Sequence, residues 1–357
     1  MRSHRIAAIG GDGVGPEVIE AGLSVLERLA ETEGFRLDVT RFDWGSDHYR
    51  RTGRMMPADG VEQLRGFDAI YFGAVGDPDI PDHVTLWDLR LAICQGLDQY
   101  ANVRPTKLLG GNAGPLRPEL GKQIDWVIIR ENSEGEYAGV GGRAHAGLPM
   151  EVAMDVAVFT RAGIERICRF ACETAMRRPR RRLTVVTKSN PERHGLVLWD
   201  EVCRDVLTDF PELDVDWKLV DAMAALMVTR PGAFDTSLAT NLHADILSDL
   251  ASALTGSLGN GATANLDATG NNPSMFEPIH GSAFDIMGKG IANPVGAFWT
   301  GAMMLEHLGE QAASERLMRA LEKISRSGPF TPDLGGQADT RSVTSAIEEE
   351  IGRSQHQ

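Results

Sequence analysis

Residues 5–18 read Arg-Ile-Ala-Ala-Ile-Gly-Gly-Asp-Gly-Val-Gly-Pro-Glu-Val, a pattern of strand, turn and helix that recurs along the chain. The apolar residues 5–9 predict a strand, the glycines a tight turn, and Pro16 the first turn of a helix that extends to about residue 31. The glycine spacing is G-x-G-x-G before proline rather than the G-x-G-x-x-G of a Rossmann unit, and no acidic residue ends a second strand at the required place. Alone, the stretch predicts a strand-to-helix turn and not a nucleotide site.

The same alternation continues beyond this first unit. Further strands are expected at residues 35–42, 69–73, 126–130, 183–187 and 214–220. Helices are expected at residues 61–64, 86–97, 161–176, 194–209, 222–229, 245–254, 294–308 and 312–327. Strands that alternate with helices predict an α/β protein with a mostly parallel sheet. The glycine-rich residues 255–270 are expected to form a long irregular passage.

The composition excludes several classes of protein. The 357 residues are 42% hydrophobic and 24% charged, and the net charge of −14 argues against nucleic acid or an anionic membrane as a partner. The basic residues 177–182 are interpreted as a solvated loop. The four cysteines form no CxxC pair and are expected to be buried thiols. The N-terminal apolar run is too short for a signal peptide and no run approaches the ~20 residues of a membrane span, so a cytoplasmic protein is expected.

Residues 241–250, Asn-Leu-His-Ala-Asp-Ile-Leu-Ser-Asp-Leu, carry the first candidate site. Asp245 and Asp249 are four residues apart, which on a helix places both carboxylates on one face about 6 Å apart along the axis. Two like charges so placed repel, whereas a divalent cation bound by both would stabilise them, and oxygen ligands favour Mg²⁺ or Mn²⁺. The alternative is that both aspartates lie in water on an amphipathic helix.

Basic residues stand at or near predicted strand ends. Arg104 lies in Val-Arg-Pro and Arg130 opens Arg-Glu-Asn-Ser-Glu-Gly-Glu-Tyr, and both could grip the carboxylates of a small acid unless they only form surface ion pairs. Tyr137 follows in a glycine-containing loop, where it could donate a proton. Lys188 ends a strand and could act as a base beside a metal, or be simply solvated. Asp221 could be a third metal ligand or a helix N-cap.

A second candidate site spans residues 277–294. Its loop offers an imidazole, backbone donors and amides to an adenine ring, and Asp285 could accept a hydrogen bond from a ribose 2′-hydroxyl and repel a 2′-phosphate. By itself the segment would pass for a capped surface loop. The candidate cofactor residues are Glu277, His280, Gly281, Ser282, Ala283, Asp285 and Asn293.

Together these segments resemble the decarboxylating dehydrogenases that act on 2R-hydroxy acids: isocitrate, 3-isopropylmalate, homoisocitrate, D-malate and tartrate. The resemblance runs from Ile6 to about Asp333 and rests on motifs in the family's order. They are the glycine loop, VRP (103–105), RENSEGEY (130–137), TKSN (187–190), NLHADILSDL (241–250), EPIHGSAFDI (277–286) and GKGIANP (288–294).

The resemblance implies an isopropylmalate dehydrogenase-like, two-domain α/β fold that is not a Rossmann fold. Residues 1–100 and 255–357 would form a large, discontinuous NAD-binding domain, and residues 101–254 a small domain with the dimer interface and the metal and substrate residues. Homodimers of this family share their active sites. The sequence leaves open whether the protein is a dimer or a tetramer, and whether K⁺ is a further cofactor.

The resemblance also implies the chemistry. Mg²⁺ or Mn²⁺ would be held by Asp245 and Asp249 together with Asp221 of the partner subunit, and would act as a Lewis acid. Lys188 of the partner subunit would remove the hydroxyl proton through a relay while hydride passes to NAD⁺. After loss of CO₂, Tyr137 would protonate the enolate. Arg104 and Arg130 would hold the substrate, and Asp285, where NADP-dependent relatives carry a basic pattern, suggests NAD.

Two departures from the family pattern bear on the substrate. Members of the family place an arginine ten residues before the VRP arginine, where this chain has Cys94. Arg90, one helical turn earlier, could replace that carboxylate clamp for a short or polar acid, and a buried arginine would oppose an isopropyl group. The expected substrate is therefore D-malate or tartrate. The alternatives are isocitrate or 3-isopropylmalate, and a catalytically degenerate regulatory homologue.

Overall fold

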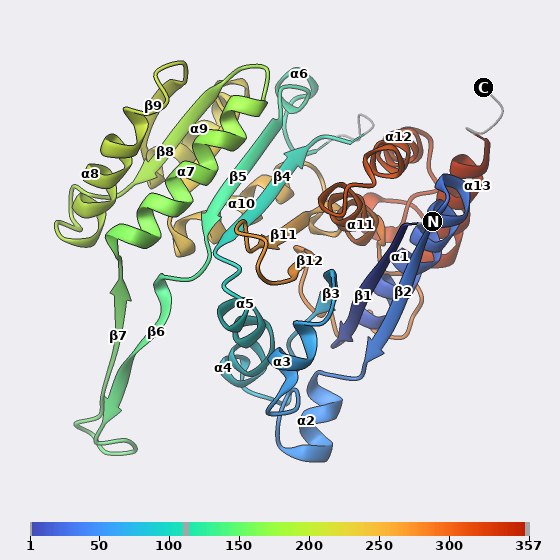
Figure 1. The fold of residues 1–357 in the computed structure, drawn as a ribbon, viewed down its shortest axis with the longest axis horizontal. Helices are drawn as coiled ribbons and strands as arrows, with labels where there is room; N and C mark the ends of the chain where they lie inside the picture. The colour runs from blue at the N-terminus through green and yellow to red at the C-terminus, as the bar shows by residue number, and fades with distance from the viewer. Residues whose placement is uncertain (1, 110–113, 354–357) are drawn as a thin grey trace.

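The computed structural model of the chain describes residues 2–109 and 114–353, and its centre is one ten-stranded sheet (Figure 1). Along the sheet the order is β2 (Phe35–Phe42), β1 (Arg2–Gly11), β3 (Ala69–Ala74), β12 (Ser274–Pro278), β11 (Ala262–Leu266), β4 (Ala101–Lys107), β5 (Asp125–Glu131), β10 (Thr236–Ala239), β8 (Arg182–Thr187) and β9 (Asp214–Leu219). This arrangement confirms the expected α/β class with a mostly parallel sheet.

The sheet changes direction at its centre. The pairs on both flanks are parallel, whereas β11 is antiparallel to β12 and β4, and β4 is antiparallel to β5. The chain passes between the two halves through these antiparallel strands. Side chains from β3, β4, β5, β11 and β12 therefore meet in the middle of the molecule, where the candidate site lies.

Helices cover both faces of each half. Strand β1 shows why, since Ile6 and Ala8 face one core and Ala7 and Ile9 face another, so its buried stretch is a continuous apolar run. The first core lies under α1 (Gly15–Glu33), α11 (Val295–His307), α12 (Gln311–Ser327) and α13 (Thr340–Arg353). The second lies under α2 (Ser46–Thr52), α3 (Gly60–Leu64), α4 (Asp82–Thr85), a π-helical turn (Leu86–Leu91) and α5 (Ala92–Gly96).

The other half of the sheet has two cores of its own. Helices α7 (Arg161–Arg177) and α8 (Gly195–Leu207) cover one face, and α9 (Val220–Thr229) and α10 (Asn241–Leu254) cover the other. A short helix, α6 (Pro118–Gly121), lies beside them. The cores of this half draw on residues 100–254, whereas the first core combines residues 6–35 with residues 262–351. The division into two domains at residues 100 and 255 stays a prediction.

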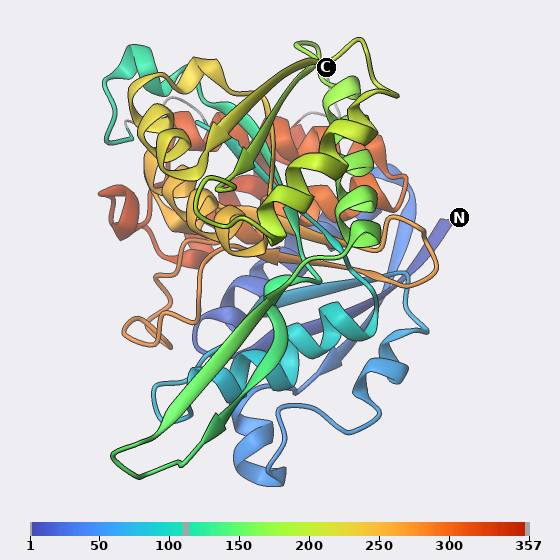
Figure 2. The same cartoon turned by 90° about the vertical axis from the view of Figure 1, so that its left-hand side faces the viewer.

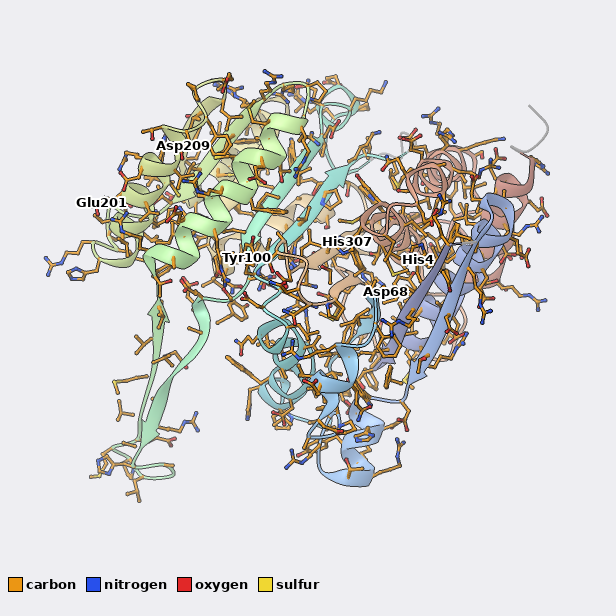
Figure 3. The ribbon with its side chains drawn as sticks, viewed as in Figure 1. His4, Asp68, Tyr100, Glu201, Asp209 and His307 are labelled. Carbon is orange, nitrogen blue, oxygen red and sulfur yellow. The ribbon has the colours of Figure 1, made fainter. Side chains whose placement is uncertain are left out.

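A two-stranded antiparallel ribbon, β6 (Gly135–Ala144) and β7 (Val152–Val158), projects from the body of the protein (Figure 2). We call it the arm. Large apolar side chains stand exposed along it: Val140, Leu148, Met150, Val152, Met154 and Val156. The surface around α8 is charged instead, as at Glu201 and Asp209 (Figure 3).

Several local predictions are confirmed. Strand β2 has the expected bounds, and α1 begins with the glycine turn and Pro16 and ends at Gly34, whose φ of 74° and N–H bond to the Ala30 carbonyl form a left-handed cap. The four cysteines are free and buried. Within the described residues, no helix combines the length and the apolar character that crossing a membrane requires.

Three local predictions are wrong. Residues 255–270 are not irregular throughout, because β11 pairs with β4 and β12 in this segment. Tyr137 lies on strand β6 rather than in a loop. The basic run is not simply solvated, since Arg178 contacts Asp235 at 2.6 Å and Arg180 donates hydrogen bonds to the carbonyls of Phe234 and Gly232. These guanidinium groups tie the end of α7 to the loop before β10.

Candidate active site

A pocket of about 230 Å³ opens where the two halves of the sheet meet, and we call it the central pocket. Its walls come from the ends of β3 and β12, the central strands β4, β5 and β11, strand β6, and helix α10. It brings together most of the substrate and metal residues expected from the sequence: Arg90, Arg104, Arg130, Tyr137, Asp245 and Asp249.

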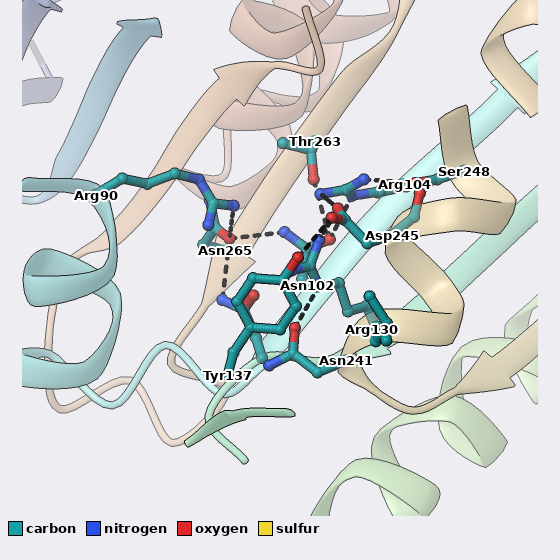
Figure 4. A network of polar contacts seen from close by, with 12 residues as sticks. Arg90, Asn102, Arg104, Arg130, Tyr137, Asn241, Asp245, Ser248, Thr263 and Asn265 are labelled. Atoms are coloured by element: carbon teal, nitrogen blue, oxygen red, sulfur yellow. Dashed lines mark hydrogen bonds and ion pairs between the residues drawn. The ribbon is translucent and has the colours of Figure 1, made fainter. Parts of the chain in front are cut away.

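Asp245 is the centre of the polar network in this pocket (Figure 4). Its Oδ1 contacts Arg104 Nη2 at 3.1 Å and also forms an ion pair with Arg130. Both guanidinium groups are held from behind, because Arg104 donates to Asn102 at 2.9 Å and Arg130 donates to Asn241 at 2.8 Å. Two buried arginines are thus fixed beside one carboxylate, and surface ion pairing is ruled out for both.

The electrostatics of the two aspartates differ. Burial alone would raise the pKa of Asp245, but the neighbouring charges of Arg130 and Arg104 bring it below its ordinary value. Desolvation raises the pKa of Asp249, and the like charge of Asp245 raises it further. The repulsion expected from the spacing is therefore present, and a cation between the two carboxylates would relieve it.

The arginines carry opposite shifts. Burial, together with the charge of Arg130, lowers the pKa of Arg104 to about 10, so this guanidinium still carries its proton at neutral pH. Burial would also lower the pKa of Arg90, but the carboxylate of Glu277 overcomes this and the pKa is raised. Both groups remain positively charged in the pocket.

Tyr137 reaches the same carboxylate from the base of the arm. Its hydroxyl donates to Asp245 Oδ2 at 3.1 Å, and its ring lies 5.2 Å from the guanidinium carbon of Arg130. Partial burial and the charge of Asp245 raise the pKa of the phenol. The hydroxyl is therefore protonated at neutral pH and can act as a proton donor.

Arg90 lies in the pocket but already has a counter-ion. Its Nε donates to Glu277 Oε1 at 2.8 Å, and Nη2 lies 2.7 Å from the same oxygen. Cys94, one turn further along, is buried in the core under α5. A guanidinium that is already neutralised by a carboxylate binds a second carboxylate weakly. The ion pair with Glu277 therefore argues against the expected role of Arg90 as a clamp for a substrate carboxylate.

Lys188 and Asp221 are not among the residues that line the central pocket. They pair with each other, with Nζ and Oδ1 2.5 Å apart, and this bond holds the pKa of Asp221 below its ordinary value. Asp221 is not an N-cap, since it is the second residue of α9 and Leu219 precedes the helix. Within residues 2–109 and 114–353, no three His, Cys, Asp or Glu side chains gather as a metal site, so one chain provides no third ligand of these types beside Asp245 and Asp249.

A second pocket, of about 760 Å³, adjoins the central pocket and is here called the loop pocket. His280 and Gly281 line both pockets. Of the expected cofactor residues, His280, Gly281, Ala283, Asp285 and Asn293 line the loop pocket, whereas Glu277 lines the central one. Two ligands could therefore meet at His280.

His280 leaves one ring nitrogen available at this junction. Its Nδ1 lies 2.9 Å from the Gly281 carbonyl, and Nε2 is buried without a partner among the described residues. Burial lowers the pKa of the imidazole, so it is neutral at neutral pH. With the proton on Nδ1, Nε2 is an acceptor that a ligand could satisfy.

The glycine turn near the N-terminus supports this loop rather than presenting a phosphate site. The Val14 N–H donates to the Ser282 carbonyl at 2.8 Å. Gly13 has a φ of +59°, and a Cβ there would stand 1.9 Å from the same oxygen. The close approach requires glycine, as the sequence suggested, and the contact explains why Ser282 faces the turn instead of the loop pocket.

Asn265 on β11 is the chief residue that the sequence did not reveal. Its Oδ1 accepts from Asn102 at 2.6 Å and from Asn132 at 3.0 Å, and its Nδ2 donates to Glu277 at 2.7 Å. Asn102 stands directly before the motif Val-Arg-Pro, and Asn132 lies within the motif that Arg130 opens. Asn265 had no such signal, because its segment was expected to be irregular.

The mostly parallel sheet and the adjoining pockets, one of them rich in arginine and aspartate, define an α/β protein with a charged site where its two halves meet. The chain belongs to the isocitrate/isopropylmalate dehydrogenase family, whose sequence model matches residues 5–351.

Named relatives and solved structures agree with this assignment. The chain is 62% identical to a probable tartrate dehydrogenase/decarboxylase of Agrobacterium vitis, over 99% of this chain and 98% of that protein. It is 46% identical to the D-malate dehydrogenase (decarboxylating) of Escherichia coli K12, over 97% and 98% of the two chains. The crystal structure of isocitrate dehydrogenase from Methylococcus capsulatus superposes with a TM-score of 0.88 at 34% identity, over 98% of this chain and 99% of that one.

Proposed function

We propose that this protein is a divalent-metal-dependent, NAD-linked enzyme that oxidises and decarboxylates a small 2R-hydroxy diacid, D-malate or tartrate. One observation carries the proposal. Two buried arginines, Arg104 and Arg130, form ion pairs with Asp245 in the central pocket, and this pocket adjoins the loop pocket. The names of the relatives from Agrobacterium vitis and Escherichia coli support the same class of substrate.

The charges of the central pocket suit such a substrate together with a cation. Three arginines (Arg90, Arg104 and Arg130) face three carboxylates (Asp245, Asp249 and Glu277), so the pocket is formally neutral. A diacid carrying two negative charges and a divalent cation would enter together without leaving net charge in a buried space. Arg104 and Arg130 would hold the carboxylates of the acid by charge-assisted hydrogen bonds.

Asp245 and Asp249 would hold the metal ion, since both carboxylates line the pocket and oxygen ligands suit Mg²⁺ or Mn²⁺. When bound, the ion supplies Lewis acidity to the 2-hydroxyl oxygen and stabilises negative charge there. Tyr137, held protonated beside Asp245, would deliver a proton to the carbon left after CO₂ departs. The proton of the 2-hydroxyl would go to Lys188 of the partner subunit.

The loop pocket would take NAD⁺. Its volume suits a ligand of this size, and because the two pockets share a wall at His280 and Gly281, a cofactor bound in the loop pocket would lie beside the substrate. Asp285 would accept a hydrogen bond from the ribose 2′-hydroxyl and repel the 2′-phosphate of NADP. Asn293 would fix the shape of the loop pocket by linking its walls. Its Nδ2 donates to Asn260 and Asp333, and its Oδ1 accepts from the Val295 N–H.

A Gly13→Ala substitution tests the role of the glycine turn in this pocket. The added Cβ would collide with the Ser282 carbonyl and displace the loop, so we expect kcat/KM for NAD⁺ to fall by about 100-fold, the loss that a misplacement of about 1 Å causes. The matched control is Gly34→Ala, which has a similar φ of +74° and nothing within 4 Å. Equal effects of the two substitutions would show that backbone strain alone, and not the loop contact, matters.

A second copy of the chain would complete the site. Helix α9 is apolar almost throughout, yet only Met223 and Met227 are buried, and the arm is lined with exposed valines and methionines. A helix that is apolar on all sides is normally covered. Asp221 and its partner Lys188 lie at the start of this helix, so a symmetric partner packed on α9 would bring its own pair toward the central pocket.

The direct test is NADH formation, followed by absorbance, with the purified protein, Mn²⁺ and each acid in turn. We expect turnover of D-malate or of L- or meso-tartrate. Little turnover of 3-isopropylmalate or isocitrate is expected, because the buried Arg90–Glu277 pair opposes the apolar substituent of the first and Glu277 repels the third carboxylate of the second. Turnover of isocitrate or 3-isopropylmalate alone would contradict the substrate assignment. Turnover with NADP⁺ in preference to NAD⁺ would contradict the role of Asp285.

A further inference from the structure

The wall of the central pocket across from Arg104 is a buried ion pair. Arg90 and Glu277 are 9% and 5% exposed, and three contacts between 2.7 and 3.1 Å join the guanidinium to the carboxylate. In Figure 4, Arg90 enters from one side, and Arg104 and Asp245 from the other. In the proposed function, Arg104 and Asp245 bind the substrate and the metal ion, whereas Arg90 and Glu277 serve only to oppose unsuitable substituents and bind no part of the substrate.

The pair is oriented from behind by a polar network. Asn265 donates to Glu277 Oε1 at 2.7 Å, and its own Oδ1 accepts from Arg90 Nη2 at 3.3 Å. Asn102 and Asn132 donate to the same oxygen and fix the amide in turn. Arg90 and Glu277 therefore cannot rotate toward an incoming group without breaking several hydrogen bonds in a buried region.

The hydrogen bonds within the pair leave one donor and one acceptor available to a ligand. Arg90 uses Nε and Nη2, whereas Nη1 donates to none of the described residues and is not among the fully buried unpartnered atoms. Glu277 Oε2 accepts only the longer bond of 3.1 Å from Arg90 Nε. The pair thus presents to the pocket one charged donor, one acceptor with spare capacity, and no net charge.

We infer that Arg90 and Glu277 together form a receptor for a hydroxyl group on C3 of the substrate, so that tartrate is preferred over its 3-deoxy counterpart, D-malate. The inference rests on the proposed function, in which Arg104, Arg130 and the metal take the two carboxylates of a four-carbon acid. The substituent on C3 of the substrate would then face the wall formed by Arg90 and Glu277.

A hydroxyl fits this wall better than the other substituents. It can accept from Arg90 Nη1 and donate to Glu277 at once. A third carboxylate would be repelled by Glu277, and an isopropyl group would remove water from the pair without replacing its hydrogen bonds. A methylene, as in D-malate, leaves the donor and the acceptor unmet, and sites built to bind a hydroxyl discriminate against analogues that lack it.

The first test needs no variant. We expect kcat/KM for the better of L- and meso-tartrate to exceed that for D-malate by roughly 10- to 100-fold, the range for hydrogen bonds to charged groups. A ratio of one or less would overturn the inference while leaving the proposed function intact. Absence of turnover with both acids would overturn the proposed function itself, so the two failures are distinguishable.

The second test removes the pair as a unit. In the double variant Arg90→Met and Glu277→Gln we expect the tartrate-to-malate ratio of kcat/KM to fall at least tenfold, because tartrate loses bonds that D-malate never makes. The control is Arg178→Met with Asp235→Asn, which removes a partly buried ion pair of 2.6 Å far from the pocket and should keep the wild-type ratio. A ratio retained in the Arg90 and Glu277 variant would overturn the inference.

Discussion

Asp245→Asn is expected to lower metal-dependent turnover by roughly 10³-fold or more, the equivalent of several kcal/mol of lost stabilisation of the transition state. The carboxylate is the shared partner of Arg104, Arg130 and Tyr137, and with Asp249 it is one of the two carboxylates that α10 brings to the central pocket. An amide is isosteric but neutral, so it would bind the cation far more weakly.

One further measurement and one control accompany this variant. Thermal unfolding with and without Mn²⁺ should show a rise in Tm for the wild type that the variant lacks, since only binding to the folded state stabilises it. The control is Asp209→Asn, which removes a surface carboxylate paired with Arg169 at 2.8 Å and should retain both turnover and the Mn²⁺ effect. Undiminished turnover in Asp245→Asn would refute the metal assignment.

Two inactive variants are expected to restore activity when their subunits are mixed. Lys188→Met and Asp245→Asn should each be inactive alone, because each site would need Lys188 of one subunit and Asp245 of the other. In a mixed dimer one site keeps both groups and the other loses both. Statistical exchange would then give about a quarter of the wild-type activity.

The same experiment distinguishes a site that lies within one chain. If Lys188 and Asp245 acted in the same subunit, no mixed dimer would contain an intact site, and mixing would restore nothing. Mixing Asp245→Asn with Asp249→Asn provides the control, since both groups line the same pocket of one chain and the two variants should not complement each other. Recovery in that control would contradict the proposed division of the site.

Local sequence was sufficient where the chain's own neighbours determine its structure. Strand β2 and the start of α1 were predictable from apolar runs and turn residues close by in the chain. Strands β11 and β12 were missed, because they are short, contain buried polar residues such as Thr263 and Asn265, and owe their extended form to pairing with distant strands. Strand β6 was missed because its glycines are typical of a loop.

The residues of the candidate site likewise fall into those that a local motif identifies and those whose contacts depend on distant parts of the chain. Residue types and spacing identified Arg104, Arg130 and Asp245, because each lies in a motif whose chemistry is recognisable alone. The partner of Arg90 could not be predicted, since Glu277 is 187 residues away and meets it only when β12 lies beside β3 and β11. Spacing also could not show that Lys188 and Asp221 pair with each other outside the pocket.

The distribution of the cores along the chain has a consequence for its synthesis. Helix α1 packs against α11, α12 and α13, so the core that begins at Ile6 includes Ile351. The buried residues of the core beneath α7 and α8 lie between Tyr100 and Leu238, with Leu266 packed against them at the edge. During synthesis on a ribosome, the middle of the polypeptide can bury its apolar side chains before α13 has been made. Strand β1 and helix α1 cannot complete their core until α13 has emerged. The residues that are made first are thus among the last to fold. Loss of α13 would destabilise α1 before the rest of the protein.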